Sequence, residues 1–154
     1  MTLDTSSFDL HRTLPLPPDR LWPVLTDPAY REKWGGPDDT AVLVVDQADL
    51  RVGGLDKLRS GPGEAPDFEI ETRWYDLTSP ERVVFTETLI IGGERLCTSL
   101  VTYNLMPEGG GTALGVTVAV SSFSGPETLA EFQAGWEGGL ANLARLCAGL
   151  AADA

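Results

Sequence analysis

The sequence predicts an α+β fold in which a curved antiparallel sheet of six to seven strands wraps around one long C-terminal helix. Two observations carry this prediction. Short segments of alternating apolar and polar residues, separated by glycine-containing turns, follow one another from residue 41 to residue 122. An amphipathic helical pattern then fills most of the remaining chain. We expect a single domain over residues 1–154, with its core at 6–150, and two short helices after the first strand.

The N-terminal part predicts one strand and two short helices. Apolar and polar residues alternate in FDLHRTLPL, which indicates the first strand. A helix follows in PPDRLWPVLTDP, and Pro23 keeps it short or distorted because proline donates no backbone hydrogen bond. Asp27 is placed as the N-cap of a second helix. That helix runs to about Trp34, before a Gly-Gly-Pro sequence ends it.

Six further segments are expected to form consecutive strands: AVLVVD, DLRVGGLDKLRS, DFEIETRWYDL, RVVFTETLII, ERLCTSLVTYNLM and TALGVTVAVSS. Gly53-Gly54, inside the second of these segments, indicates a bulge or a bend. Gly92-Gly93 fits a two-residue hairpin turn, since glycine adopts positive φ at both positions. Short turns between consecutive strands imply antiparallel pairing.

The C-terminal helix is the clearest predicted element. Ser124 and Glu127 fit a capping box, and apolar residues then recur at spacings of three and four over about 24 residues. Gly135 and Gly139 flank the apolar face, where they either let the sheet approach closely or leave a space that side chains would have filled. A sheet of this size curls by its own twist, so wrapping it around one helix predicts a cavity between them.

Composition and charge exclude several function classes. The net charge of −12 argues against nucleic-acid binding, because an acidic surface repels phosphates. No apolar run approaches the roughly 20 residues of a membrane span, and the N-terminus lacks a signal-peptide pattern, so we expect no membrane partner and a cytoplasmic location. Cys97 and Cys147 are expected to be buried free thiols, and His11 is expected to be structural or exposed. The spacing of these residues supports no metal site, and we expect no cofactor.

Four stretches of the chain agree in order and spacing with one known pattern. PPDRLWPVLTDPAYREKWGGP resembles the N-terminal signature of the family named after the activator of the heat-shock protein 90 ATPase, within the START-like (SRPBCC, polyketide cyclase/dehydrase and lipid transport) superfamily. VGG at 52–54, SPERVVFTE at 79–87, and GGGTALGVTV at 109–118 followed by Gly135-Trp136 extend the resemblance over nearly the whole chain. It implies a helix-grip fold with an internal apolar cavity. Relatives commonly carry a second tryptophan at the position of Gly35, and many carry a histidine near Val118.

Strand and helix periodicity place a set of mostly aromatic and aliphatic side chains toward the space between sheet and helix. We expect these residues to bind a ligand: Trp34, Phe68, Ile70, Trp74, Phe85, Tyr103, Val118, Phe132, Trp136 and Leu140. Trp34 is expected at the entrance of the cavity.

Glu87, Tyr103 and Arg12 are the candidate catalytic residues. Glu87 is in step with the inward residues of its strand, and an inward carboxylate is costly unless it is paired, so it would mark function. A strand end or bulge that returns Glu87 to solvent is the alternative. Arg12 is in step with the inward residues of the first strand and would pair with Glu87 or with an anionic ligand.

Three functions remain open. A binding protein that holds a small hydrophobic or aromatic molecule is favoured, because the fold forms a cavity and no recognisable catalytic set is present. A cyclase- or dehydratase-type enzyme is the alternative, since such reactions need a shaped pocket and one or two acid-base groups. A co-chaperone-like protein-binding domain ranks last, and a chaperone partner is not expected. Homodimerisation through sheet edges or apolar patches is left open.

Overall fold

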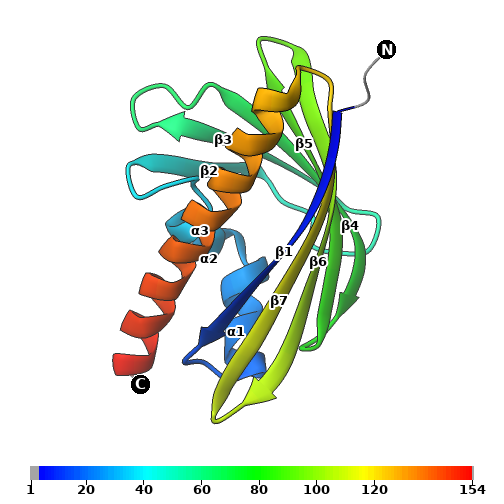
Figure 1. The fold of residues 1–154 in the computed structure, drawn as a ribbon. Helices are drawn as coiled ribbons and strands as arrows, with labels where there is room; N and C mark the ends of the chain where they lie inside the picture. The colour runs from blue at the N-terminus through cyan, green and yellow to red at the C-terminus, as the bar shows by residue number, and fades with distance from the viewer. Residues whose placement is uncertain (1–3, 154) are drawn as a thin grey trace.

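The computed structural model describes residues 4–153 and contains a seven-stranded antiparallel sheet around a long helix, as the sequence predicts (Figure 1). The sheet order is β1-β7-β6-β5-β4-β3-β2, so β1 and β2 form its edges. The strands are β1 (Asp4–Leu14), β2 (Ala41–Gln47), β3 (Leu55–Pro62), β4 (Phe68–Thr78), β5 (Arg82–Ile91), β6 (Glu94–Glu108) and β7 (Gly111–Ser122). The helices are α1 (Pro18–Thr26), α2 (Pro28–Trp34) and α3 (Pro126–Ala152).

All three helices lie on the inner side of the curved sheet, where α2 packs against both α1 and α3 (Figure 1). Between them and the sheet, one large cluster of buried side chains forms the core. Cys97 and Cys147 belong to this core and are free thiols, as expected. Within residues 4–153, no helix combines the length and the apolarity needed to cross a membrane.

The junction between α1 and α2 depends on Pro28. Val24 lies in the last turn of α1, where carbonyls have no intrahelical donor, and Pro28 four residues later has no N–H to offer it. The indole Nε1 of Trp34 donates to this carbonyl at 2.7 Å and takes the place of the missing N–H. Asp27 caps α2 as predicted, since its Oδ1 accepts a hydrogen bond from the Ala29 backbone N–H at 2.9 Å. Trp34 and Asp27 therefore hold the two short helices at a defined angle.

The second strand of the predicted meander is shorter than expected. β3 begins at Leu55, and the residues before it form a tight turn rather than part of the strand. Gly53 has φ of +84°, and a Cβ at Gly54 would collide with the Asp49 carbonyl oxygen, so the two glycines form a bend. Asp56 holds this turn, because its Oδ1 accepts a hydrogen bond from the Asp49 backbone N–H at 2.7 Å.

The predicted capping box of the C-terminal helix is wrong. The N-cap of α3 is Gly125, at φ of +100°, and no side chain caps the helix. The Ser124 hydroxyl instead donates to the Leu96 carbonyl at 3.2 Å and lies 2.6 Å from the Thr128 hydroxyl. Ser124 therefore anchors the start of the helix to the N-terminal end of β6, a contact between residues 28 positions apart that local patterns do not reveal.

The glycines of α3 permit a close approach, but to a loop rather than to the sheet. A Cβ at Gly138 would collide with the Pro37 carbonyl oxygen, and one at Gly139 would lie 3.4 Å from the Gly36 carbonyl oxygen. One turn further along, Asn142 Nδ2 donates to the carbonyls of Gly36 and Asp38 at 3.1 and 2.9 Å. The helix thus holds the loop that follows α2 against its own backbone.

Candidate functional site

A pocket of about 530 Å³ lies between the sheet and α3, within the size range of small-molecule sites. Each wall comes from a different part of the chain. The α1–α2 segment and the following loop contribute Leu25, Arg31, Trp34, Gly35 and Pro37. The strands contribute Leu43, Leu58, Ser60, Gly61, Phe68, Ile70, Trp74, Phe85, Glu87, Leu89, Ile91, Leu96 and Tyr103. The region of α3 contributes Ser124, Thr128, Glu131, Phe132, Gly135, Trp136 and Gly139.

Most of the residues predicted to bind a ligand line this pocket. Eight of the ten do so: Trp34, Phe68, Ile70, Trp74, Phe85, Tyr103, Phe132 and Trp136. Val118 and Leu140 do not line it, because both are fully buried in the packed core. Sequence periodicity identifies a buried face but does not distinguish a side chain that borders empty space from one that packs against its neighbours.

Trp34 lies deeper than expected. Its side chain is 6% exposed and its indole N–H is bonded to α1, so it forms part of the inner wall rather than the entrance. Phe68 and Ile91, which are 38% and 36% exposed, lie instead where the pocket meets solvent. Gly35 does not widen the pocket, because the Leu43 side chain occupies the place that its Cβ would take.

The sheet register places a polar row between two apolar rows on the inner face. Asp56, Thr72, Glu87 and Ser99 are direct cross-strand neighbours on β3, β4, β5 and β6. Leu58, Ile70, Leu89 and Cys97 form the row on one side. Trp74, Phe85, Val101 and Val118 form the row on the other. The polar row reaches the pocket wall at Glu87, the member of the row that lines the pocket.

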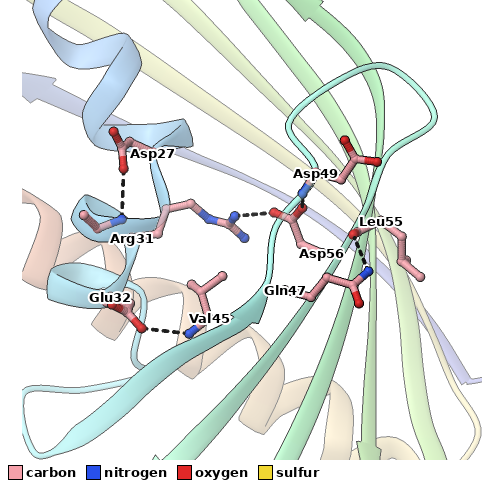
Figure 2. A network of polar contacts seen from close by, with 9 residues as sticks. Asp27, Arg31, Glu32, Val45, Gln47, Asp49, Leu55 and Asp56 are labelled. Atoms are coloured by element: carbon pink, nitrogen blue, oxygen red, sulfur yellow. Dashed lines mark hydrogen bonds and ion pairs between the residues drawn. The ribbon is translucent and has the colours of Figure 1, made fainter.

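A buried ion pair, which sequence reasoning missed, occupies one end of this row (Figure 2). Arg31 Nη1 on α2 donates to Asp56 Oδ2 at 2.6 Å, and the two side chains are 10% and 1% exposed. The guanidinium also lies over the Trp74 ring, 5.2 Å from its centroid. Asp56 is in step with Leu58 and Ser60 on β3, and this alternation was the available signal that its carboxylate points inward.

Glu87 lines the pocket, and no hydrogen bond or ion pair within residues 4–153 involves its carboxylate. Burial raises the pKa of Glu87 to about 7, and the nearby Arg31 charge only partly offsets this effect. Burial and the Glu87 charge likewise raise the pKa of the Tyr103 hydroxyl, which keeps it protonated. The pocket thus contains one carboxyl group able to gain or lose a proton near neutral pH.

Arg12 does not join Glu87. Its Nη1 donates to the backbone carbonyl of His11 at 2.8 Å, near the surface, and Arg12 does not line the pocket. The cation whose charge reaches Glu87 is Arg31, on a different element. His11 is exposed on β1, opposite Gly115 of β7.

Aromatic side chains connect the apolar row at Trp74 to α3. Trp74 and Phe85 pack edge to face with ring centroids 5.4 Å apart, and Phe85 and Tyr103 do so at 5.3 Å. Tyr103 continues the series to Trp136 on α3 at 6.1 Å. Two polar atoms in the wall, Ser60 Oγ and Trp74 Nε1, are buried without a hydrogen-bond partner. Such atoms are uncommon in proteins and call for a partner that a bound molecule or water would supply.

No group of three or more His, Cys, Asp or Glu side chains within the described residues is arranged to hold a metal ion. The available chemistry is therefore that of one proton-exchanging carboxyl group, a phenol and several hydrogen-bond donors inside a largely apolar space.

Comparison with known proteins relates this chain to one family. A family model described as Activator of Hsp90 ATPase homolog 1-like protein matches residues 15–148. The Mll3558 protein from Rhizobium loti is 30% identical with a TM-score of 0.80, over 94% of this chain and 99% of that one. The CV1439 protein from Chromobacterium violaceum is 28% identical with a TM-score of 0.78, over 92% and 96%. No curated protein matches the chain.

Proposed function

The chain belongs to the Activator of Hsp90 ATPase homolog 1-like protein family and has its START-like fold, and on that premise we propose that it binds a small hydrophobic or aromatic molecule. The observation that carries the proposal is the pocket of about 530 Å³, whose wall is mostly aliphatic and aromatic. A packed protein interior leaves few voids larger than a water molecule, so a space of this size needs a reason.

The aromatic side chains suit a flat apolar ligand. Trp74, Phe85, Tyr103 and Trp136 form a connected edge-to-face series, and a planar molecule beside them gains both buried area and ring contacts. The ligand enters past the exposed Phe68 and Ile91.

Native mass spectrometry of the purified protein and displacement of a hydrophobic fluorescent dye test this function. We expect a co-purified small molecule or dye binding that the molecule displaces. A Gly135→Leu variant should lose dye binding, because Gly135 lines the pocket and a leucine side chain there would fill part of it. The fold should tolerate the change, since the new Cβ would meet only Pro37 Cβ, at an ordinary 3.5 Å. Gly149→Leu is the matched control on the same helix, at a site with nothing within 4 Å. A protein that binds no dye and carries no molecule would refute the proposal.

A cyclase- or dehydratase-type enzyme is the second candidate, and the position of Glu87 favours it. A carboxyl group whose pKa is about 7 exchanges a proton readily at neutral pH, and the neutral Tyr103 hydroxyl in the same pocket donates a hydrogen bond. Incubation with an aromatic β-hydroxy ketone in deuterated water tests this role. Deuterium incorporation next to the carbonyl should require wild-type protein and be lost in Glu87→Gln. Binding of the ketone without any exchange would exclude this candidate.

A further inference from the structure

The polar row restricts which chemical groups a ligand can place in the pocket. The row has two carboxylates among the described residues, Asp56 and Glu87. Of these, Glu87 lines the pocket and has no hydrogen-bond or ion-pair partner. Asp56, by contrast, is satisfied by Arg31 on one oxygen and by the Asp49 backbone N–H on the other. Glu87 is half-buried, and a carboxylate without a partner in a largely apolar pocket is costly, so a bound group that pairs with it recovers part of that cost.

Among residues 4–153, Arg31 is the only Lys or Arg in the pocket wall, and its guanidinium is already bound to Asp56 at 2.6 Å. The described wall therefore has no cation free to bind a ligand. Ionised Glu87 therefore leaves a net negative charge on the group formed by Arg31, Asp56 and Glu87. Glu131 on α3 adds another carboxylate to the exposed part of the wall. The electrostatics of the pocket disfavour an anionic ligand and favour a cationic one.

The surrounding rings also suit a cation. The Arg31 guanidinium lies over the face of Trp74, Phe85 packs against Trp74, and Tyr103 packs against Phe85. Thr72, the direct neighbour of Glu87 across the sheet, is 1% exposed, and its Oγ1 has no hydrogen-bond partner. Thr72 does not line the pocket, so Glu87 is the acceptor that the row offers to a bound group, and an ammonium group carries three donors for it.

Resting on the proposed binding function, we propose that the ligand is a hydrophobic amine whose protonated nitrogen is bound by the Glu87 carboxylate. The apolar part of the molecule then lies along the aromatic series toward Trp136, and the charged end lies at the polar row. Below about pH 7, where Glu87 holds a proton, binding of the ammonium group converts Glu87 to its ionised form and releases that proton. The Arg31 charge on α2 lowers the pKa of Glu87, and the Glu87 charge in turn raises the pKa of Cys97 and of Tyr103 on β6.

Isothermal titration calorimetry with three probes of one skeleton tests this inference: 2-(2-naphthyl)ethylamine, the corresponding alcohol and the corresponding carboxylate. At pH 8 the amine should bind about tenfold or more tightly than the alcohol, with the carboxylate weakest. Affinity for the amine should rise from pH 6 to pH 8 while that for the alcohol stays level, because only the amine requires ionised Glu87. Titration in two buffers of different ionisation enthalpy should detect proton release with the amine alone.

Variants separate Glu87 from the general negative field. Glu87→Gln should weaken the amine by about tenfold or more and leave the alcohol unchanged. Glu137→Gln removes an exposed carboxylate of α3 that does not line the pocket, and it should change the amine by less than about twofold. Equal losses in the two variants, or amine and alcohol binding alike to wild-type protein, would overturn the inference while leaving the binding function intact. If none of the three probes binds and no hydrophobic dye is displaced, the binding function itself fails.

Discussion

Trp34 has a structural role beside its place in the pocket wall. Its indole N–H replaces the backbone donor that Pro28 lacks and satisfies the Val24 carbonyl at 2.7 Å. Trp34→Phe keeps most of the ring and removes this donor. We expect the free energy of unfolding to fall by about 1–3 kcal/mol, measured by urea denaturation, because a buried carbonyl is left unpaired. Trp22→Phe, which changes a half-buried residue of α1, is the control. If it lowers the free energy of unfolding by the same amount, the smaller ring and not the lost hydrogen bond explains the effect of Trp34→Phe.

Glu87 makes stability depend on pH in a predictable direction. Its pKa rises from 4.5 to about 7 on folding, so between these values the folded protein holds a proton that the unfolded chain has lost. The free energy of unfolding therefore falls as pH rises through this window, by on the order of 3 kcal/mol from this group. Glu87→Gln removes this contribution.

Denaturant titrations at pH 4.5, 6 and 8 check this prediction. The stability of Glu87→Gln relative to wild type should increase steadily with pH. Glu69→Gln, which changes an exposed carboxylate on β4, should follow the wild-type pH profile. A Glu87→Gln curve parallel to that of wild type would mean that Glu87 keeps its ordinary pKa in the folded protein.

At the scale of elements, the Arg31–Asp56 pair joins α2 to the start of β3. With both side chains almost fully buried, removing one partner leaves an uncompensated charge. Arg31→Met should lower the free energy of unfolding by about 3–5 kcal/mol, whereas the double variant Arg31→Met/Asp56→Leu should lose much less. Additive losses in a double-mutant cycle, measured by chemical denaturation, would show that the two charges are not coupled.

The contact between α3 and the loop after α2 reverses the usual effect of a helical glycine. Glycine to alanine inside a helix normally stabilises by about 1 kcal/mol. Gly138→Ala should instead lower the melting temperature, because the new methyl group meets the Pro37 carbonyl oxygen. Gly149→Ala on the same helix meets nothing within 4 Å and should raise it. Stabilisation by both changes would show that the loop moves away without cost.

For the whole molecule, the net charge of −12 is the dominant electrostatic property. Repulsion among like charges destabilises a compact state, and salt screens it. We expect the melting temperature to rise by a few degrees between 20 mM and 500 mM sodium chloride, followed by circular dichroism. The exposed ion pairs Arg51–Asp49, Arg59–Asp46 and Arg82–Asp76 should not reverse this trend, since exposed pairs contribute little. A lower melting temperature in salt would contradict this view of the surface charge.

Much of the fold is predictable from local patterns. The alternation along the strands, the glycine turns and the spacing of three and four in the last helix are properties of neighbouring residues, and the structure has the predicted sheet and helices. The misplaced start of β3 and the wrong cap of α3 have one cause. Both segments are held by partners distant in space, Trp74 for the turn at Gly53 and Leu96 for Ser124.

Local patterns also predict some features of the candidate site and miss those that depend on distant segments. Periodicity correctly placed Glu87 among the inward residues of β5, because the strand remains regular through this position. The same periodicity predicted Arg12 as the cation beside Glu87, whereas the nearby cation is Arg31. Local sequence patterns do not distinguish the two arginines, because only the packing of β1 and α2 decides which one lies near Glu87. Periodicity also included Val118 and Leu140, because burial alone does not reveal an adjoining void.

Short-range periodicity and composition predict the order and type of the elements, the buried face of each strand and the acidic charge of the chain. The folded structure was needed to show that Arg31 binds Asp56, that Glu87 has no partner among the described residues, and that α3 approaches a loop. Each of these depends on which distant segments meet when the sheet curves around the helix, and side chains far apart in the chain carry no local signal of that meeting.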